Sequence, residues 1–116
     1  MTATPIGPYR PIVRAGEWLI VSGQLGLQDG TLVDGVAEQT RVAIENLAGH
    51  LASEGAELAD VAKTLCFLAD MDDFAVFNEA YGVGFGDHRP ARSTVGVAGL
   101  PLAARVEIEA WAYRPV

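Results

Sequence analysis

Two short stretches of the sequence carry side chains that could bind and activate a small molecule. In "RPARSTVGV", residues 89–97, Arg92 stands at the start of an alternating pattern typical of a strand, and Thr94 follows two residues later. In "RVEIEAWAY", residues 105–113, Glu107 and Glu109 are two positions apart and therefore point to the same side of a strand. A guanidinium can bind both oxygens of a carboxylate, and a glutamate beside a bound water can take a proton from it.

The pattern leaves two interpretations of these residues open. A turn near Gly99 and Leu100 predicts that the last two strands form an antiparallel hairpin, which would gather Arg92, Thr94 and Glu107 on one sheet face. A structural salt bridge between Arg92 and Glu107 is the more common outcome of such a pattern, and it would add only about 0.2–1 kcal/mol. The alternative is an anion site in which Arg92 holds a carboxylate.

Periodicity predicts the elements that would position these side chains. Apolar residues recur at helical spacing over about 36–54, with Asp34 as the expected N-cap and Gly55 as the residue that ends the helix. A second helix is predicted in "DDFAVFNEAYGVGF", capped by Asp72 or Asp73. The stretches with strand patterns include "EWLIVSGQLGL", "DVAKTLCFLAD", "PARSTVGV" and "RVEIEAWAY".

The order ββ-α-β-α-ββ over residues 1–116 predicts a single α+β domain with both helices on one face of the sheet. In the last strand, Val106, Ile108 and two alanines form a clear core face, and Val95 and Val97 are expected to anchor the preceding strand in the core. Two helices cannot cover both faces of a sheet, and an apolar face left uncovered usually marks an interface. We therefore expect a homo-oligomer.

Composition narrows the function classes. The formal net charge of −7, with seven arginines and one lysine, disfavours nucleic-acid binding. No apolar run approaches the roughly 18 residues of a membrane span, and the N-terminal residues do not resemble a signal peptide, so a cytoplasmic protein is expected. Cys66 is expected to be a small buried side chain. His50 and His88 are expected at the surface, without metal-ligand spacing.

Several motifs together resemble the reactive-intermediate deaminase (Rid, YjgF-like) family, of the 2-iminobutanoate/2-iminopropanoate deaminase type. They are "IGPYRP", "VSGQLGL", "QTRVAIENLAGHLASEGAELADVAKTLCFLADMDDFAVFNEAY", "RPARSTVGVAGLP" and "VEIEAWA". The resemblance implies a chorismate-mutase-like fold in a homotrimeric barrel, with ligand clefts between subunits. It also implies hydrolysis of 2-imino acids to 2-oxo acids and ammonia in metabolite damage control, without metal or organic cofactor.

The resemblance also implies roles for individual residues. Arg92 would hold the substrate carboxylate, and the backbone at Thr94, where relatives often have cysteine, would contact the ligand. Glu107 would position and polarise the attacking water, while Tyr9 would lie near the imine nitrogen. Ser22 and Gly23 of "SGQ" would line the pocket.

Two other functions remain as alternatives at this point. The chain could be a non-catalytic module that binds small carboxylates, or an endoribonuclease that inhibits translation. The acidic charge and the lack of a His/Lys catalytic set argue against the second.

Overall fold

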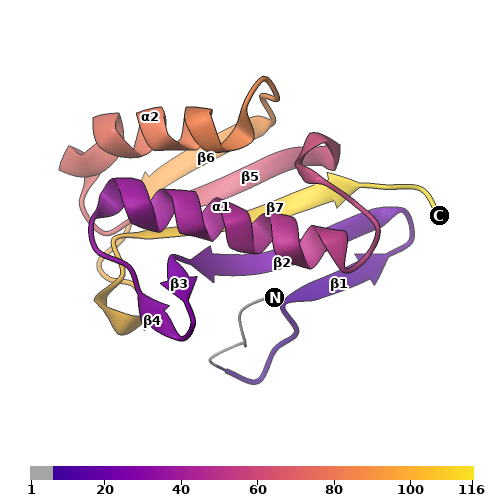
Figure 1. The fold of residues 1–116 in the computed structure, drawn as a ribbon, viewed down its shortest axis with the longest axis horizontal. Helices are drawn as coiled ribbons and strands as arrows, with labels where there is room; N and C mark the ends of the chain where they lie inside the picture. The colour runs from indigo at the N-terminus through magenta and orange to yellow at the C-terminus, as the bar shows by residue number, and fades with distance from the viewer. Residues whose placement is uncertain (1–6) are drawn as a thin grey trace.

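The computed structural model describes residues 7–116 and contains one main sheet, one small hairpin and two α-helices (Figure 1). The strands are β1 (Ile12–Ala15), β2 (Trp18–Leu25), β3 (Leu27–Gln28), β4 (Thr31–Leu32), β5 (Val61–Leu68), β6 (Ala91–Gly96) and β7 (Val106–Tyr113). The helices are α1 (Val36–Ala52) and α2 (Phe74–Phe85). Apart from the small β3–β4 hairpin, the element order is the predicted ββ-α-β-α-ββ.

The main sheet has five strands in the order β1-β2-β7-β5-β6. All neighbours are antiparallel except β5 and β6, which are parallel and are joined by α2. Both helices pack on the same face of the sheet, with α1 in front of β2 and β7 and α2 beside β6 (Figure 1). The predicted α+β class with two helices on one face is therefore confirmed.

The predicted hairpin between the last two strands is wrong. β5 lies between β6 and β7, and it pairs with both of them. The apolar strands β5 and β7 take central positions, whereas β6, which carries Arg92 and follows Pro90, lies at the sheet edge. Edge positions tolerate charged side chains and proline better than central ones do.

The core lies between the helices and one face of the sheet. Alternate residues of β7, beginning with Val106 and Ile108, are fully buried, as the strict alternation predicts. They meet the apolar stripe of α1, which includes Leu47 and Leu51. Cys66 of β5 is buried in the same cluster, so its expected position is confirmed.

The other face of the sheet carries exposed apolar side chains. Val13, Trp18, Ile20 and Val95 lie on it with 38–43% of their surface exposed. The expectation that Val95 anchors β6 in the core is therefore wrong: β6 turns Arg92 and Thr94 toward the helices instead. No helix of residues 7–116 covers this open face, which is the exposed apolar surface that the sequence predicted.

The ends of the helices agree only in part with the expected caps. Gly55 has a φ of 75°, and the amide of Ala56 donates to Leu51 O at 2.9 Å, so a left-handed glycine ends α1 as predicted. At the other end the N-cap is Gly35, not Asp34, and no side chain caps the helix. Asp73, one of the two predicted residues, is the N-cap of α2, although its side chain makes no capping hydrogen bond to the helix.

The described part of the chain contains neither a membrane-spanning candidate nor a metal-ligand cluster. No helix in residues 7–116 combines the length and the apolar character needed to cross a bilayer. The same residues hold no group of three His, Cys, Asp or Glu side chains placed to share a metal ion.

His50 is not at the surface as expected, but is only 2% exposed on the core side of α1. Its Nε2 is buried without a hydrogen-bond partner among the described residues. Burial lowers the pKa of the His50 imidazole, because charging the ring there would remove it from water.

This burial predicts that the fold loses stability in mild acid. The folded state holds His50 neutral, so its contribution is complete above the unfolded pKa of about 6.5 and is lost as the pH falls below it, by at most about 1.4 kcal/mol per pH unit. Urea unfolding between pH 7.5 and 5 should therefore show a steeper loss for the wild type than for His50→Leu. Parallel profiles for the two proteins would contradict a buried neutral histidine.

Candidate functional site

Arg92 lies on the helix-covered face of β6, next to α2. Its Cα pairs with that of Thr64, a fully buried residue of β5, which fixes the side to which Arg92 points. The guanidinium Cζ is 4.9 Å from the ring centre of Tyr81 and 5.6 Å from those of Phe74 and Phe77. These distances are within the range of cation–π attraction.

Arg92 makes no ion pair with any acidic residue in residues 7–116. No hydrogen bond from its guanidinium to another described residue is present either. The salt bridge with Glu107, the more common interpretation of the sequence pattern, is therefore wrong. A half-buried guanidinium with free N–H donors is suited to bind an anion from outside the chain.

Thr94 follows Arg92 on the same face of β6. Its Cα pairs with that of Cys66, and its Oγ1 is buried without a hydrogen-bond partner in the described residues. Burial raises the pKa of the neighbouring Cys66 thiol to about 11, so this cysteine stays protonated at neutral pH. The polar group available beside Arg92 is thus a hydroxyl and not a thiolate.

Glu107 lies on the open face of the sheet. Its Cα pairs with Phe67 of β5 and Leu25 of β2, whereas the flanking Val106 and Ile108 are buried under the helices. Burial, and secondarily the charge of Glu109, raise the pKa of the Glu107 carboxyl above its ordinary value. A carboxylate with a raised pKa is a stronger base toward a bound water.

Gly23 provides the space that the Glu107 carboxylate occupies. A Cβ at position 23 would be 1.9 Å from Glu107 Oε2, far closer than any real contact. The pairing of β2 with β7 shifts register between Val21 and Gln24, so an irregularity in the strand lies at this place. Such bulges often redirect side chains next to functional sites.

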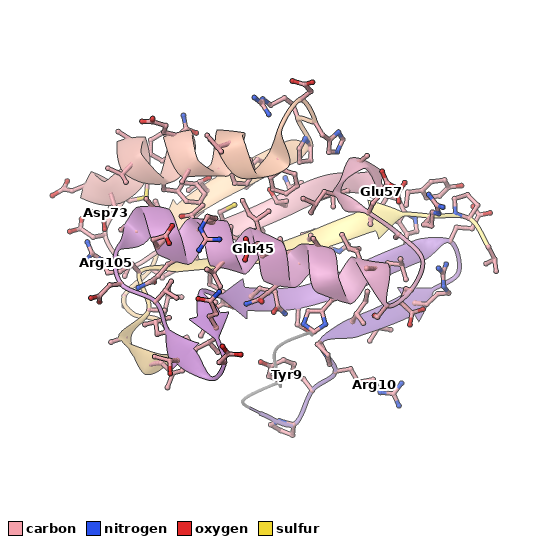
Figure 2. The ribbon with its side chains drawn as sticks, viewed as in Figure 1. Tyr9, Arg10, Glu45, Glu57, Asp73 and Arg105 are labelled. Carbon is pink, nitrogen blue, oxygen red and sulfur yellow. The ribbon has the colours of Figure 1, made fainter. Side chains whose placement is uncertain are left out.

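Ser22 connects this region to the segment that carries Tyr9. Ser22 Oγ donates a hydrogen bond to Arg10 O at 2.7 Å, and the Ser22 amide donates to Pro11 O at 2.9 Å. Tyr9 is 46% exposed, and Figure 2 shows it on the loop before β1 with Arg10 extending away from it. Ser22 therefore fixes the backbone next to Tyr9.

The predicted site residues form two separate groups within one chain. Arg92 and Thr94 lie on the helix-covered face, whereas Glu107 lies beside Gly23 on the open face. The expectation that Arg92, Thr94 and Glu107 share one face is wrong. β5 lies between their two strands and sets the register. Arg92 is in line with Thr64 and Ala110, which face the helices. Glu107 is in line with Phe67 and Val95, which face the other way.

Sequence reasoning missed the contribution of α2 to this region. Phe74, Phe77 and Tyr81 recur at helical spacing, which by itself indicates only an apolar stripe on α2; in the structure they also contact the guanidinium of Arg92. The signal that could have revealed them is the β5–α2–β6 order, because a helix that joins two parallel neighbouring strands packs over them.

The chain matches the family described as Endoribonuclease L-PSP over residues 1–114. The 2-iminobutanoate/2-iminopropanoate deaminase of Mus musculus is 44% identical over 112 residues, covering 94% of this chain and 83% of the mouse protein. The YjgF gene product of E. coli has a TM-score of 0.93 at 37% identity, covering 97% of this chain and 93% of that one. E. coli TdcF with bound serine has a TM-score of 0.92 at 36% identity, with the same coverage of both chains.

The raised pKa of Glu107 predicts a pH-dependent gain in stability when its charge is removed. A carboxyl whose folded pKa exceeds its unfolded value stabilises the fold below the unfolded pKa, and this contribution is lost as the pH rises through the folded value. Glu107→Gln should therefore raise the melting temperature more at pH 7 than at pH 4. A larger gain at pH 4 would contradict the destabilised charge.

Proposed function

Because the chain belongs to the endoribonuclease L-PSP family, we propose that it is an imine deaminase, which hydrolyses 2-imino acids to 2-oxo acids and ammonia. Mammalian and bacterial relatives at 39–44% identity carry the name 2-iminobutanoate/2-iminopropanoate deaminase. The structural observation that carries the proposal is Arg92, a half-buried guanidinium without an acid partner in residues 7–116. A 2-imino acid brings the carboxylate that this cation lacks.

The proposed reaction requires a held substrate, a water and a place for one proton. Arg92 binds the substrate carboxylate, with the backbone at Thr94 beside it, and Ser22 and Gly23 line the cleft. Glu107 accepts a proton as water adds to the iminium carbon, which gives a neutral carbinolamine. Return of that proton to nitrogen makes ammonia the leaving group, with Tyr9 close to it. As the C–N bond breaks, the carbinolamine hydroxyl gives its proton to Glu107 and becomes the carbonyl of the 2-oxo acid.

The iminium carbon is already electrophilic, so positioning supplies most of what the reaction needs. The raised pKa of Glu107 supports its role, since it makes proton transfer from water less unfavourable than it would be to an ordinary carboxylate. Gly23 supports the same role, because its missing side chain lets the carboxylate lie against β2.

The complete site is proposed to form between two copies of the chain in a homotrimer. Arg92 and Glu107 lie on opposite faces of one sheet, so one chain does not bring them to the same substrate. The exposed apolar open face supports self-association, and a second copy packed on it would bring its own Arg92 edge near Glu107. The number of three subunits follows the family resemblance.

Two alternative functions lead to different results in the same assays. The first is a non-catalytic module that binds small carboxylates, and the structure of the relative TdcF with bound serine supports this kind of ligand. The second is RNA cleavage, as the family description suggests. The net charge of −7 argues against it, and the lone lysine, Lys63, donates to Ser93 Oγ at 2.9 Å on the sheet.

Arg92→Ala tests the proposed function. An amino-acid oxidase generates the imine in situ, and the release of 2-oxo acid is followed with and without the protein. The wild type should accelerate release. Arg92→Ala should lose at least about 100-fold in kcat/KM, because it lacks the guanidinium N–H groups that bind the substrate carboxylate. Arg89→Ala serves as the matched control, since Arg89 donates to the carbonyls of Gly86 and His88 instead.

The same assay separates the alternatives. A wild type that binds a 2-oxo acid without accelerating imine hydrolysis would establish the binding module. Glu107→Gln should keep 2-oxo acid binding and lose most turnover; equal loss of both would remove Glu107 from the catalytic role.

Complementation tests the shared site. The Arg92→Ala and Glu107→Gln proteins should each be nearly inactive alone, but subunit exchange at equal amounts should restore about a quarter of the sites, since a quarter of random interfaces join two intact groups. Light scattering before and after exchange gives the mass of the assembly. Activity that stays at the level of the unmixed variants in exchanged oligomers would place Arg92 and Glu107 of one chain at the same site.

A further inference from the structure

Arg92 is held differently from the arginines of the chain that form ion pairs. Arg14, Arg41, Arg105 and Arg114 each form an ion pair with an acidic residue, at 2.5–3.9 Å. The pair of Arg105 with Asp73 is visible near the beginning of α2 in Figure 2. At Arg92 the contacts come from three aromatic rings of α2.

We propose that Phe74, Phe77 and Tyr81 are positioning residues that hold Arg92 ready for the substrate in place of an acid partner. This inference rests on the proposed function and extends it to α2, which touches no substrate. An aromatic face attracts a cation without accepting its N–H bonds as a carboxylate would. The guanidinium donors therefore remain available, and the substrate carboxylate becomes their only anionic partner.

The rings are themselves fixed relative to the strand next to Arg92. The hydroxyl of Tyr81 forms a 2.7 Å hydrogen bond with Thr64 Oγ1, and Thr64 is the β5 residue that pairs with Arg92. Tyr81 and Phe77 lie 5.6 Å apart between ring centres, and Phe77 is fully buried. A buried and hydrogen-bonded set of rings therefore limits the positions that the Arg92 side chain can adopt.

The position of Phe74 makes the proposal testable without disrupting the core. Phe74 is only partly buried at the start of α2, yet its ring centre is 5.6 Å from Arg92 Cζ. Phe85 is a matched control: it is a buried phenylalanine of the same helix, 4.8 Å from the Tyr81 ring, and its recorded ring contacts are with Tyr81 and His88.

The test compares Phe74→Leu, Phe74→Tyr and Phe85→Leu in two measurements. One is the KM and kcat for the in-situ imine; the other is the Kd for 2-oxobutanoate by calorimetry, with Arg92→Ala as the reference for lost binding. Phe74→Leu should raise KM and Kd about tenfold with kcat within about twofold, because ground-state and transition-state binding are weakened alike. Phe74→Tyr should recover most of that loss.

Phe85→Leu should lower the melting temperature while KM and Kd stay near the wild-type values. An equal rise of KM and Kd in Phe74→Leu and Phe85→Leu, or no rise in Phe74→Leu, would contradict the proposal and show that the rings only pack the core. Absence of any Arg92-dependent binding of 2-oxobutanoate would also overturn the proposal. Binding that depends on Arg92 and Phe74 without imine hydrolysis would instead support the positioning role and reject the deaminase.

Discussion

The uncompensated charge of Arg92 is the constraint on which the rest of this structure depends. A guanidinium keeps its charge at any physiological pH, so a half-buried position requires some partner. Four other arginines of the chain use carboxylates for this purpose, and each of those pairs occupies donors that a ligand would need. At β6 three aromatic rings of α2, those of Phe74, Phe77 and Tyr81, take the place of a carboxylate partner. Two of these rings have a second role, because Phe77 and Tyr81 also belong to the hydrophobic core. If Arg92 binds the substrate as proposed, the stability of the fold and the affinity for the ligand both depend on α2.

A second constraint is the alternation of side chains along a strand. Arg92 and Glu107 point to opposite faces of a sheet whose one face is filled by helices. A domain of 116 residues has too few elements to cover both faces, and it leaves valine, isoleucine and tryptophan exposed on the second. The proposed self-association would address both facts together, because one packing event would cover the apolar face and join the two halves of the proposed site. An acid and a cation that would neutralise each other within one chain would thereby be kept apart until assembly.

The sequence predicted those features that depend on local patterns. The strict alternation of β7 identified both its core face and the side of Glu107, and the helical period identified α1 with its terminal Gly55.

Features that depend on strand order were not predictable from local patterns. β6 and β7 are consecutive in sequence, yet β5 separates them, and this reversed the expected faces of Arg92 and Val95. The surface position expected for His50 is wrong for a different reason: histidine is a polar residue type, but this position belongs to the buried stripe of α1. The motif resemblance implied the candidate site residues, but only the register shows that Arg92 and Glu107 lie on opposite faces of one chain's sheet.

The net negative charge of the chain repels an anionic substrate, whereas the guanidinium of Arg92 attracts it. A net charge of −7 repels any carboxylate at long range, but salt limits that repulsion to about 8 Å at physiological ionic strength. Within that distance, direct contacts determine whether the ligand binds. Arg92 lies against uncharged aromatic rings, where its charge is screened less than in water. Glu107 and Glu109 are also desolvated, so a ligand with a second negative charge would meet unfavourable neighbours if it reached β7. The charge pattern therefore favours a ligand with one carboxylate and no second negative charge, which is the form of a small 2-imino acid.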